Sequence, residues 1–201
     1  MNIIMLSGEK RSGKDTTANF LAAHLTKCGY EVYSIALADA MKEVLVTTFG
    51  IDLATLEDMK NTGGGMSFYD SECDEHVGFI SMRKILQNFG QGLKASTHND
   101  FIWCELADDK LEYDNPKVVY ILTDIRLPLE QEYFSQTYDY STDKVTTIKL
   151  FRPENESTDQ HISETSVKDV KADYEIVNSG TLNDLEHEII NILKDLKYTE
   201  E

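Results

Sequence analysis

The sequence contains little of what marks secreted, membrane or zinc proteins. Its three cysteines, Cys28, Cys73 and Cys104, show no paired spacing, so neither a disulfide framework nor a zinc site is indicated. No apolar run reaches the roughly 18 residues that a membrane-spanning helix needs. The apolar run at the N-terminus is short and lacks the basic flank of a signal peptide. These absences favour a protein of the reducing cytoplasm with no membrane partner.

Positive charge is scarce as well. The chain has 36 acidic residues against 19 Lys and Arg, a formal net charge of −17, which argues against a nucleic-acid polymer as partner. A small anionic substrate needs only a local cluster of positive charge. Arginine, whose planar fork suits phosphate, occurs at only four positions: Arg11, Arg83, Arg126 and Arg152. The alternative, that these four only pair with surface carboxylates, stays open at this point.

Linkers and repeats are missing too. No proline-rich or low-complexity segment divides the 201 residues, and the hydrophobic fraction of 41% is ordinary for a globular protein. A chain of this length is long enough for one fair-sized core. We therefore predict a single domain over residues 1–201.

Apolar strands alternate with amphipathic helices along the chain. Strands are expected at residues 2–7, 31–37, 117–123, 145–151 and 174–177. Helices are expected at residues 14–27, 39–49, 81–89, 100–112 and 129–134, and after the capping pair Thr181 and Asp184. This alternation predicts an α/β fold of three layers: a central parallel sheet of about five strands with helices on both faces.

Residues 51–78 are the least readable part. They contain three consecutive glycines and many acids, which indicates a mobile loop or a short hairpin. The polar stretch at 152–171 has few apolar anchors, which suits a lid that closes over a site.

The stretch GEKRSGKDTT, residues 8–17, follows the first apolar run and fits the phosphate-loop pattern G-x-x-x-x-G-K at Gly8, Gly13 and Lys14. Glycines allow backbone N–H groups to approach a phosphate closely, and the next helix offers its N-terminus to the same anion. An ordinary turn between strand and helix is the weaker alternative.

Two further patterns narrow the class of phosphate-loop protein. The N-K-x-D motif of GTPases is missing, and Asp124 is followed by Ile125 and Arg126, where many ATPases have Asp-Glu. Asp15 stands where such loops usually carry Ser or Thr, while Thr16 and Thr17 follow at once. The pattern therefore favours a small kinase over a GTPase or motor ATPase.

Several blocks of the chain resemble the phage deoxynucleoside monophosphate kinases. The first block, LSGEKRSGKDTTANFL, is the most specific, and the later blocks follow in the family's order from residue 2 to about residue 193. The later blocks are RKILQNFG (83–90), FIW (101–103), TDIRLPLEQE (123–132), FRPENESTDQHISE (151–164) and IVNSGTLNDL (176–185). Animal-type phosphomevalonate kinases are distantly similar around the loop and QHISE. Nothing aligns convincingly over residues 51–78.

The resemblance implies ATP as phosphate donor and Mg²⁺ as cofactor. Metal contacts are expected from Asp15 and Thr16, although an acid in a first helical turn is favoured by the helix dipole alone. Residues expected to contact the donor nucleotide are Gly8, Lys10, Ser12, Gly13, Lys14, Asp15, Thr16, Thr17, Asn178, Gly180 and Thr181. Thr181 fills a helix-cap role in either case.

On the acceptor side, Arg126 is expected to hold the acceptor's phosphate, because ligands bind where parallel strands end. Four cations would carry the transfer itself: Lys14, Arg126, Arg152 and Arg11. Residues expected to contact the acceptor are Lys10, Arg11, Lys42, Arg83, Gln87, Trp103, Asp124, Arg126, Glu130 and His161. The plain alternatives are a strand-end ion pair for Asp124, a core role for Trp103 and a solvated loop for His161.

Taken with the resemblance, the sequence predicts an ATP- and Mg²⁺-dependent kinase that converts deoxynucleoside monophosphates to diphosphates for dNTP supply, in the host cytoplasm. Two alternatives stay open: a kinase of another small phosphorylated acceptor such as phosphomevalonate, and a non-catalytic nucleotide-binding protein. The resemblance and the unassigned apolar residues Phe68 and Phe79 also favour a homodimer.

Overall fold

The computed structural model describes residues 1–70, 75–112, 115–138, 144–153 and 166–198. The chain forms two compact units. Unit 1 comprises residues 1–37 and 107–201, and unit 2 comprises residues 38–106. The expectation of one domain over the whole chain stays a prediction.

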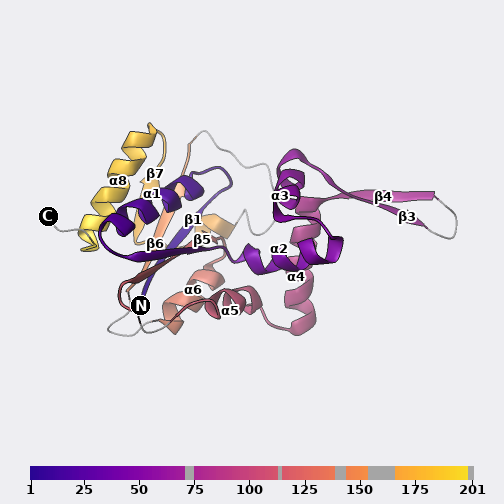
Figure 1. Cartoon of the computed structure of the whole chain (residues 1–201), viewed down its shortest axis with the longest axis horizontal. Helices are drawn as coiled ribbons and strands as arrows, with labels where there is room; N and C mark the ends of the chain where they lie inside the picture. Colours follow the sequence, from indigo (N-terminus) through magenta and orange to yellow (C-terminus); the bar gives the residue numbers. More distant parts are fainter. Residues whose placement is uncertain (71–74, 113–114, 139–143, 154–165, 199–201) are drawn as a thin grey trace. The chain divides into compact units, whose positions relative to one another are not determined.

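Unit 1 contains a five-stranded sheet in the order β2-β5-β1-β6-β7, in which every neighbouring pair is parallel (Figure 1). Its strands are β1 (Asn2–Gly8), β2 (Glu31–Ile35), β5 (Val118–Ile125), β6 (Lys144–Phe151) and β7 (Tyr174–Val177). The predicted parallel sheet of about five strands is confirmed. The central strand β1 is buried along its whole length, which explains its continuous apolar run.

Helices cover both faces of this sheet (Figure 1). On one face, α1 (Lys14–Lys27) packs against α8 (Leu182–Asp195). Ile4 and Leu6 of β1 belong to the core beneath these two helices. Ile3 and Met5 are equally buried and point to the other face, because side chains alternate along a strand. That face carries α6 (Pro128–Thr137) and the short helix η1 (Ser166–Asp169).

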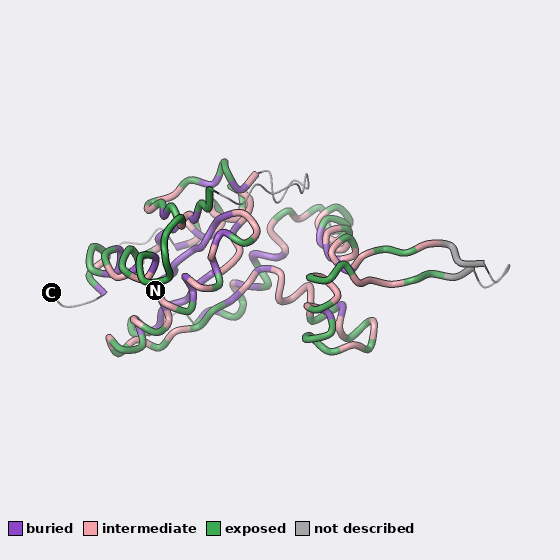
Figure 2. The backbone as a smooth tube through the Cα atoms, turned by 90° about the horizontal axis from the view of Figure 1, so that it is seen from above, coloured by how far each residue is buried: buried purple, intermediate pink, exposed green. Residues whose placement is uncertain are grey.

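In unit 1, β1 and β5 are buried along most of their length, whereas α1 and α8 have buried residues at intervals among exposed ones, as an amphipathic pattern predicts (Figure 2). None of the described helices is long and apolar enough to cross a bilayer.

Unit 2 contains three helices and a hairpin, and α5 (Ile102–Asp108) spans its boundary with unit 1. The elements are α2 (Ala38–Phe49), α3 (Leu53–Thr62), β3 (Gly65–Asp70), β4 (Glu75–Ser81) and α4 (Met82–Thr97). Their shared core is formed by Leu45, Leu56, Met82 and Leu86. β3 and β4 pair in antiparallel fashion, so the short hairpin predicted within residues 51–78 is confirmed.

The interpretation of residues 53–62 as part of a loop was wrong, because they form α3. The Asp52 side chain caps this helix by accepting a hydrogen bond from the Thr55 amide at 2.7 Å, and Gly63 ends it with φ +84°. Leu56 is fully buried. Acidic residues around a single deeply buried leucine concealed the helical period.

The expected helix end at Gly90 was also wrong, since α4 continues to Thr97. Gly90 is buried inside the helix, and a Cβ there would lie 2.9 Å from Cε of Met41. Glycine at this position therefore serves close packing between helices rather than helix termination.

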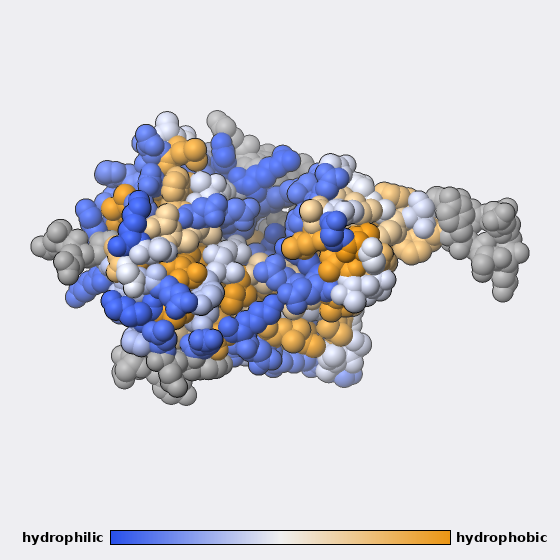
Figure 3. Space-filling model, viewed as in Figure 1, coloured by the Kyte–Doolittle hydropathy of each residue, from blue (hydrophilic) through white to orange (hydrophobic). Residues whose placement is uncertain are grey.

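Apolar side chains are exposed on the hairpin of unit 2. Phe68 is 41% exposed and Phe79 is 54% exposed, and Figure 3 shows apolar surface over this part of the unit. The homodimer expected from these two residues stays a prediction.

Candidate active site

The loop between β1 and α1 requires glycine at two positions. Gly8 has φ +151° and Gly13 has φ +108°, which side-chain-bearing residues rarely adopt. A Cβ on Gly8 would lie 2.6 Å from the Leu150 carbonyl oxygen, and one on Gly13 would lie 2.5 Å from Nδ2 of Asn178. The loop therefore passes tightly between the ends of β6 and β7, as a phosphate-binding loop requires.

Lys14, the first residue of α1, turns back over this loop. Its side chain is buried, and Nζ donates hydrogen bonds to the carbonyl oxygens of Gly8 and Glu9, each at 2.8 Å. The loop thus presents a cation at the helix N-terminus, where an anion is stabilised.

Three buried hydroxyl groups surround the same loop. The side-chain oxygens of Ser7, Ser12 and Thr17 have no hydrogen-bond partner among the described residues. A buried polar group without a partner costs about 1–3 kcal/mol, so three such groups around one loop indicate a place where a ligand supplies the missing bonds. The loop, its lysine and these hydroxyls together fit a bound phosphate group.

A turn far away in sequence closes this loop from the side. Nδ2 of Asn178 donates to the Ser12 carbonyl oxygen at 2.9 Å, and the Asn178 amide donates to the Phe151 carbonyl oxygen at 2.7 Å. This places the 178–181 turn against the phosphate loop. The helix-cap role of Thr181 is also confirmed, because its hydroxyl accepts from the Asp184 amide while Asp184 accepts from the Thr181 amide. Gly180 lies within this turn, next to the Asp184 side chain.

The remaining loop and first-turn residues differ in exposure. Arg11 and Asp15 are exposed, whereas Lys10 and Thr16 are half-buried. Arg11 has φ +63°, so its backbone is held in the left-handed region at the tip of the loop. Among the described residues, no cluster of three or more His, Cys, Asp or Glu side chains is arranged to hold a metal ion. Mg²⁺ commonly takes only one or two carboxylates from the protein and the rest from phosphates and water, so Asp15 fits that need.

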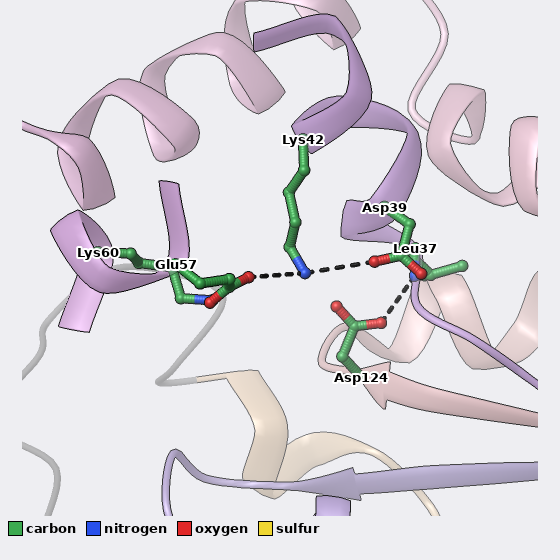
Figure 4. Close-up of polar contacts among 6 residues, drawn as sticks. All are labelled: Leu37, Asp39, Lys42, Glu57, Lys60 and Asp124. Carbon is green, nitrogen blue, oxygen red and sulfur yellow. Dashed lines mark hydrogen bonds and ion pairs between the residues drawn. The ribbon is translucent and has the colours of Figure 1, made fainter. Parts of the chain in front are cut away.

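Three of the predicted acceptor residues lie at or after the end of β5: Asp124 in the strand, Arg126 in the turn that follows and Glu130 in α6. Oδ1 of Asp124 accepts a hydrogen bond from the Leu37 amide at 2.8 Å (Figure 4). Oε2 of Glu130 accepts from the amides of Arg126 and Leu127, at 3.0 and 3.1 Å. Both carboxylates therefore accept hydrogen bonds from backbone amides, and the sequence did not reveal these partners. Arg126 is half-buried on the turn that Glu130 holds.

Two predicted residues belong to the segment expected to form a lid. Arg152 directly follows β6, at the same edge of the sheet as the phosphate loop, and is exposed. His161 lies outside the described residues, as does most of the 152–171 segment, so the lid stays a prediction.

Lys42 lies in unit 2 and is held by two carboxylates. Its Nζ is 3.0 Å from Oε1 of Glu57 and 3.3 Å from Oδ1 of Asp39, and Glu57 also pairs with Lys60 (Figure 4). Burial alone would lower the pKa of Lys42, but the contacts with Glu57 and Asp39 raise it above its usual value. Burial alone would raise the pKa of Glu57, but hydrogen bonds from Lys60 and Lys42 lower it.

Glu57 and Lys60 were not among the predicted site residues. Their i,i+3 spacing on α3 is a signal in the sequence, but it is visible only once residues 53–62 are known to be helical.

Arg83 and Gln87 lie one turn apart on the predicted helix, α4, and both are half-buried. Their contact with the acceptor stays a prediction. Trp103 favours the core alternative instead. Its ring is 4% exposed and packs near Phe89, with ring centroids 6.0 Å apart, and its Nε1 donates to the Gly90 carbonyl oxygen at 3.1 Å. Because Trp103 is buried, the indole would have to move before it could stack on a base.

Comparison with known proteins gives a consistent result. The family model described as deoxynucleotide monophosphate kinase matches residues 2–65 and 65–189. The deoxynucleotide monophosphate kinase of Enterobacteria phage T4 is 26% identical over 252 aligned positions, which cover 98% of this chain and all of the relative. That of Escherichia phage RB69 is also 26% identical, over 96% of this chain and all of the relative. A deoxynucleoside-5′-monophosphate kinase of Escherichia phage T5 is 29% identical over 56% of this chain and 46% of its own length.

Proposed function

The chain belongs to the deoxynucleotide monophosphate kinase family, and on that premise we propose that it transfers a phosphoryl group from ATP to deoxynucleoside 5′-monophosphates. The products are ADP and a deoxynucleoside diphosphate, a precursor for dNTP supply in the cytoplasm of the host. One observation carries the proposal. The residues that match the family model contain a phosphate loop with a buried lysine and, among the described residues, three buried hydroxyls without partners.

Phosphoryl transfer depends mostly on positioning and on neutralising charge. In the proposed donor site the ammonium group of Lys14 leaves the Gly8 and Glu9 carbonyl oxygens and contacts the outer phosphates. Backbone amides of the loop and the N-terminus of α1 hold the same phosphates. The hydroxyls of Ser12 and Thr17 complete their hydrogen bonds there.

Magnesium fits the first turn of α1. Asp15 and Thr16 would hold Mg²⁺, in part through water, and the ion would supply charge neutralisation between the phosphates. The chain's own contribution is to fix the carboxylate of Asp15 at the helix N-terminus, next to Lys14.

Replacing Asp15 with Ser tests this role. We expect the Mg²⁺ concentration for half-maximal activity to rise roughly tenfold, because a hydroxyl is a weaker ligand for this ion than a carboxylate. A titration of activity against Mg²⁺ measures the shift. Unchanged magnesium dependence and turnover would leave only the dipole role for Asp15.

In the proposed acceptor site, cationic side chains bind the phosphate of the deoxynucleotide. Arg126 would clamp it from the end of β5, and Lys10, Arg11 and Arg152 would neutralise the migrating group. In unit 2, Lys42, Arg83 and Gln87 would contact the acceptor, with Gln87 at a base edge. An arginine next to both leaving and attacking oxygens stabilises the charge that develops in transfer.

A coupled ADP-release assay with ATP and Mg²⁺ tests the proposal. The acceptors are dTMP, dGMP, dCMP, dAMP, the matching ribonucleotides and phosphomevalonate. We expect turnover on deoxynucleotides in the wild type and at least a hundredfold loss in Lys14→Ala. Lys27→Ala, at the exposed end of α1, is the matched control and keeps wild-type turnover.

Other outcomes reassign the function. Turnover on phosphomevalonate alone would make the chain a kinase of a different phosphorylated acceptor. ATP binding with no turnover on any acceptor would make it a non-catalytic nucleotide-binding protein, and the family likeness would then describe the fold only.

A further inference from the structure

The chain segments of β2 and β5 stay in contact beyond the last backbone pair of their ladder. The last parallel pair is Ile35 with Leu122. Two residues further along each strand, Leu37 and Asp124 occupy the positions where the ladder would continue. There the Leu37 amide donates to a side chain, Oδ1 of Asp124, at 2.8 Å (Figure 4).

A bulge in β5 explains the change from backbone to side chain. Met5 of β1 pairs with Leu122, but Ser7 pairs with Ile125, so β5 contains one residue more than β1 over this stretch. A bulge bends its strand and redirects the side chains within it. Asp124 lies inside the bulge, and its carboxylate takes the place of the backbone acceptor that would otherwise have continued the ladder to Leu37.

Leu37 is a critical position in the chain. It is the last residue of unit 1, it is 5% exposed, and only Ala36 and Leu37 separate β2 from α2. A hydrogen bond at the Leu37 amide therefore fixes the point at which the chain leaves unit 1 for α2, the helix that carries Lys42.

Arg126 follows Asp124 two residues later in the chain. The Arg126 amide is held by Oε2 of Glu130 at 3.0 Å. Two carboxylates thus anchor consecutive pieces of backbone at this edge of the sheet, one before α2 and one before α6.

We propose that Asp124 is a positioning residue: its carboxylate holds the Leu37 amide and thereby orders the start of α2. The kinetic consequence rests on the proposed function, whereas the hydrogen bond does not. This role requires an acceptor oxygen at Oδ1 but no negative charge. A contact through a metal-bound water, or a pairing with a cation of the site, requires the charge instead.

That difference makes Asp124→Asn and Asp124→Ala a decisive pair. Asparagine has the same size and keeps an oxygen that accepts from Leu37, while alanine removes the acceptor. We expect amide hydrogen exchange at Leu37 to be about 10- to 100-fold faster in Asp124→Ala, and close to the wild-type rate in Asp124→Asn. The Ile121 amide, in the middle of β5, reports any global unfolding in the same sample.

Kinetics give the second measurement. In Asp124→Ala we expect the KM for the deoxynucleotide to rise roughly tenfold, with the Kd for ATP and the magnesium dependence unchanged, and in Asp124→Asn most of this defect to be absent. Asp109→Ala, an exposed carboxylate of unit 1, is the matched control and alters neither the exchange rate nor the KM.

Two results would overturn the proposal. Unchanged exchange at Leu37 in Asp124→Ala would show that the hydrogen bond orders nothing. Equal kinetic damage in the Asn and Ala variants, or a shifted magnesium requirement in both, would assign Asp124 a charge-dependent contact with ligand. If the wild type phosphorylates no deoxynucleotide, the proposed function fails, but the exchange measurement still decides the role of Asp124.

Discussion

At the residue scale, one hydrogen bond at the proposed donor site joins residues 166 positions apart. Nδ2 of Asn178 donates to the Ser12 carbonyl oxygen, and the missing side chain of Gly13 leaves room for it. Neither residue alone shows this partnership in the sequence. The bond ties the phosphate loop to the turn after β7, so the two parts of the proposed ATP site keep their spacing.

Replacing Asn178 with Ala should weaken ATP binding about three- to tenfold, since one neutral hydrogen bond within a preformed site is lost. The KM for the deoxynucleotide should change little, because Asn178 has no part in the proposed acceptor contacts. Nucleotide titration by calorimetry measures the first quantity and the coupled assay the second. Ser179→Ala, on the same turn and exposed, is the control. An unaltered ATP affinity in Asn178→Ala would mean that the turn is held by the backbone alone.

At the element scale, α2 and α3 are joined by a shared core and by the ion pairs of Glu57 with Lys42 and Lys60. The lowered pKa of Glu57 means that its contribution to stability is present above the unfolded-state pKa of about 4.3 and is lost as pH falls through the folded value. Because the pKa of Lys42 is raised, its contribution to stability is present below the unfolded-state pKa of about 10.4 and is lost as the pH rises through the folded value.

Glu57→Gln should therefore lower the free energy of unfolding by about 0.5–1 kcal/mol at pH 7, a modest value because the side chain is about a third exposed. The difference from the wild type should shrink as the pH falls through the lowered folded-state pKa of Glu57, because the carboxylate is then protonated and its ion pairs are lost. Thermal unfolding from pH 3 to 7 measures it, with the exposed Asp58→Asn on the same helix as control. A difference that stays constant as the pH falls would point to packing rather than charge.

The N-terminus of α8 offers a second test at this scale. Thr181→Ala removes the hydroxyl that accepts from the Asp184 amide and should cost about 1 kcal/mol, or roughly 2–4 °C in melting temperature. Thr181→Ser keeps the cap and should melt within about 1 °C of the wild type. Calorimetry compares the three proteins. Equal melting temperatures for the alanine and serine variants would show that the Asp184 half of the capping box is sufficient.

At the scale of the whole molecule, each compact unit has a core of its own. Leu56 is fully buried in unit 2 and Ile189 is fully buried in unit 1. The phosphate loop lies entirely in unit 1, whereas Lys42, Arg83 and Gln87 lie in unit 2. The proposed ATP site should therefore respond to core substitutions in unit 1, and the proposed contacts of Lys42, Arg83 and Gln87 to core substitutions in unit 2.

Leu56→Ala should destabilise unit 2 by about 2–5 kcal/mol and speed amide exchange there, while exchange in the sheet of unit 1 and the Kd for ATP stay close to wild type. Ile189→Ala should show the reverse pattern. Hydrogen exchange resolved by residue measures both. Acceleration of the two units together in either variant would show that they unfold as one cooperative body.

Patterns that depend on a short stretch of chain were predicted well. The apolar strands β1, β5 and β6, the helix α1 after the loop and the capping pair at Thr181 were all found in place. The errors occurred where packing against residues remote in the sequence determines the local structure. α3 was missed because Leu56 is its one buried residue, so no repeating apolar face shows in its sequence. Gly90 was interpreted as a helix end because its packing against Met41 is not visible in one dimension.

The amino-acid sequence by itself determined the phosphate loop, the α/β alternation and the resemblance to the family, because each depends on residue types at fixed spacing. Only the tertiary structure decided the partners of the polar groups: Asn178 with Ser12, Asp124 with the Leu37 amide, and Lys42 with Glu57. The physical reason is distance. A hydrogen bond or ion pair forms over about 3 Å in space, and no local pattern states which remote residue the fold will bring that close.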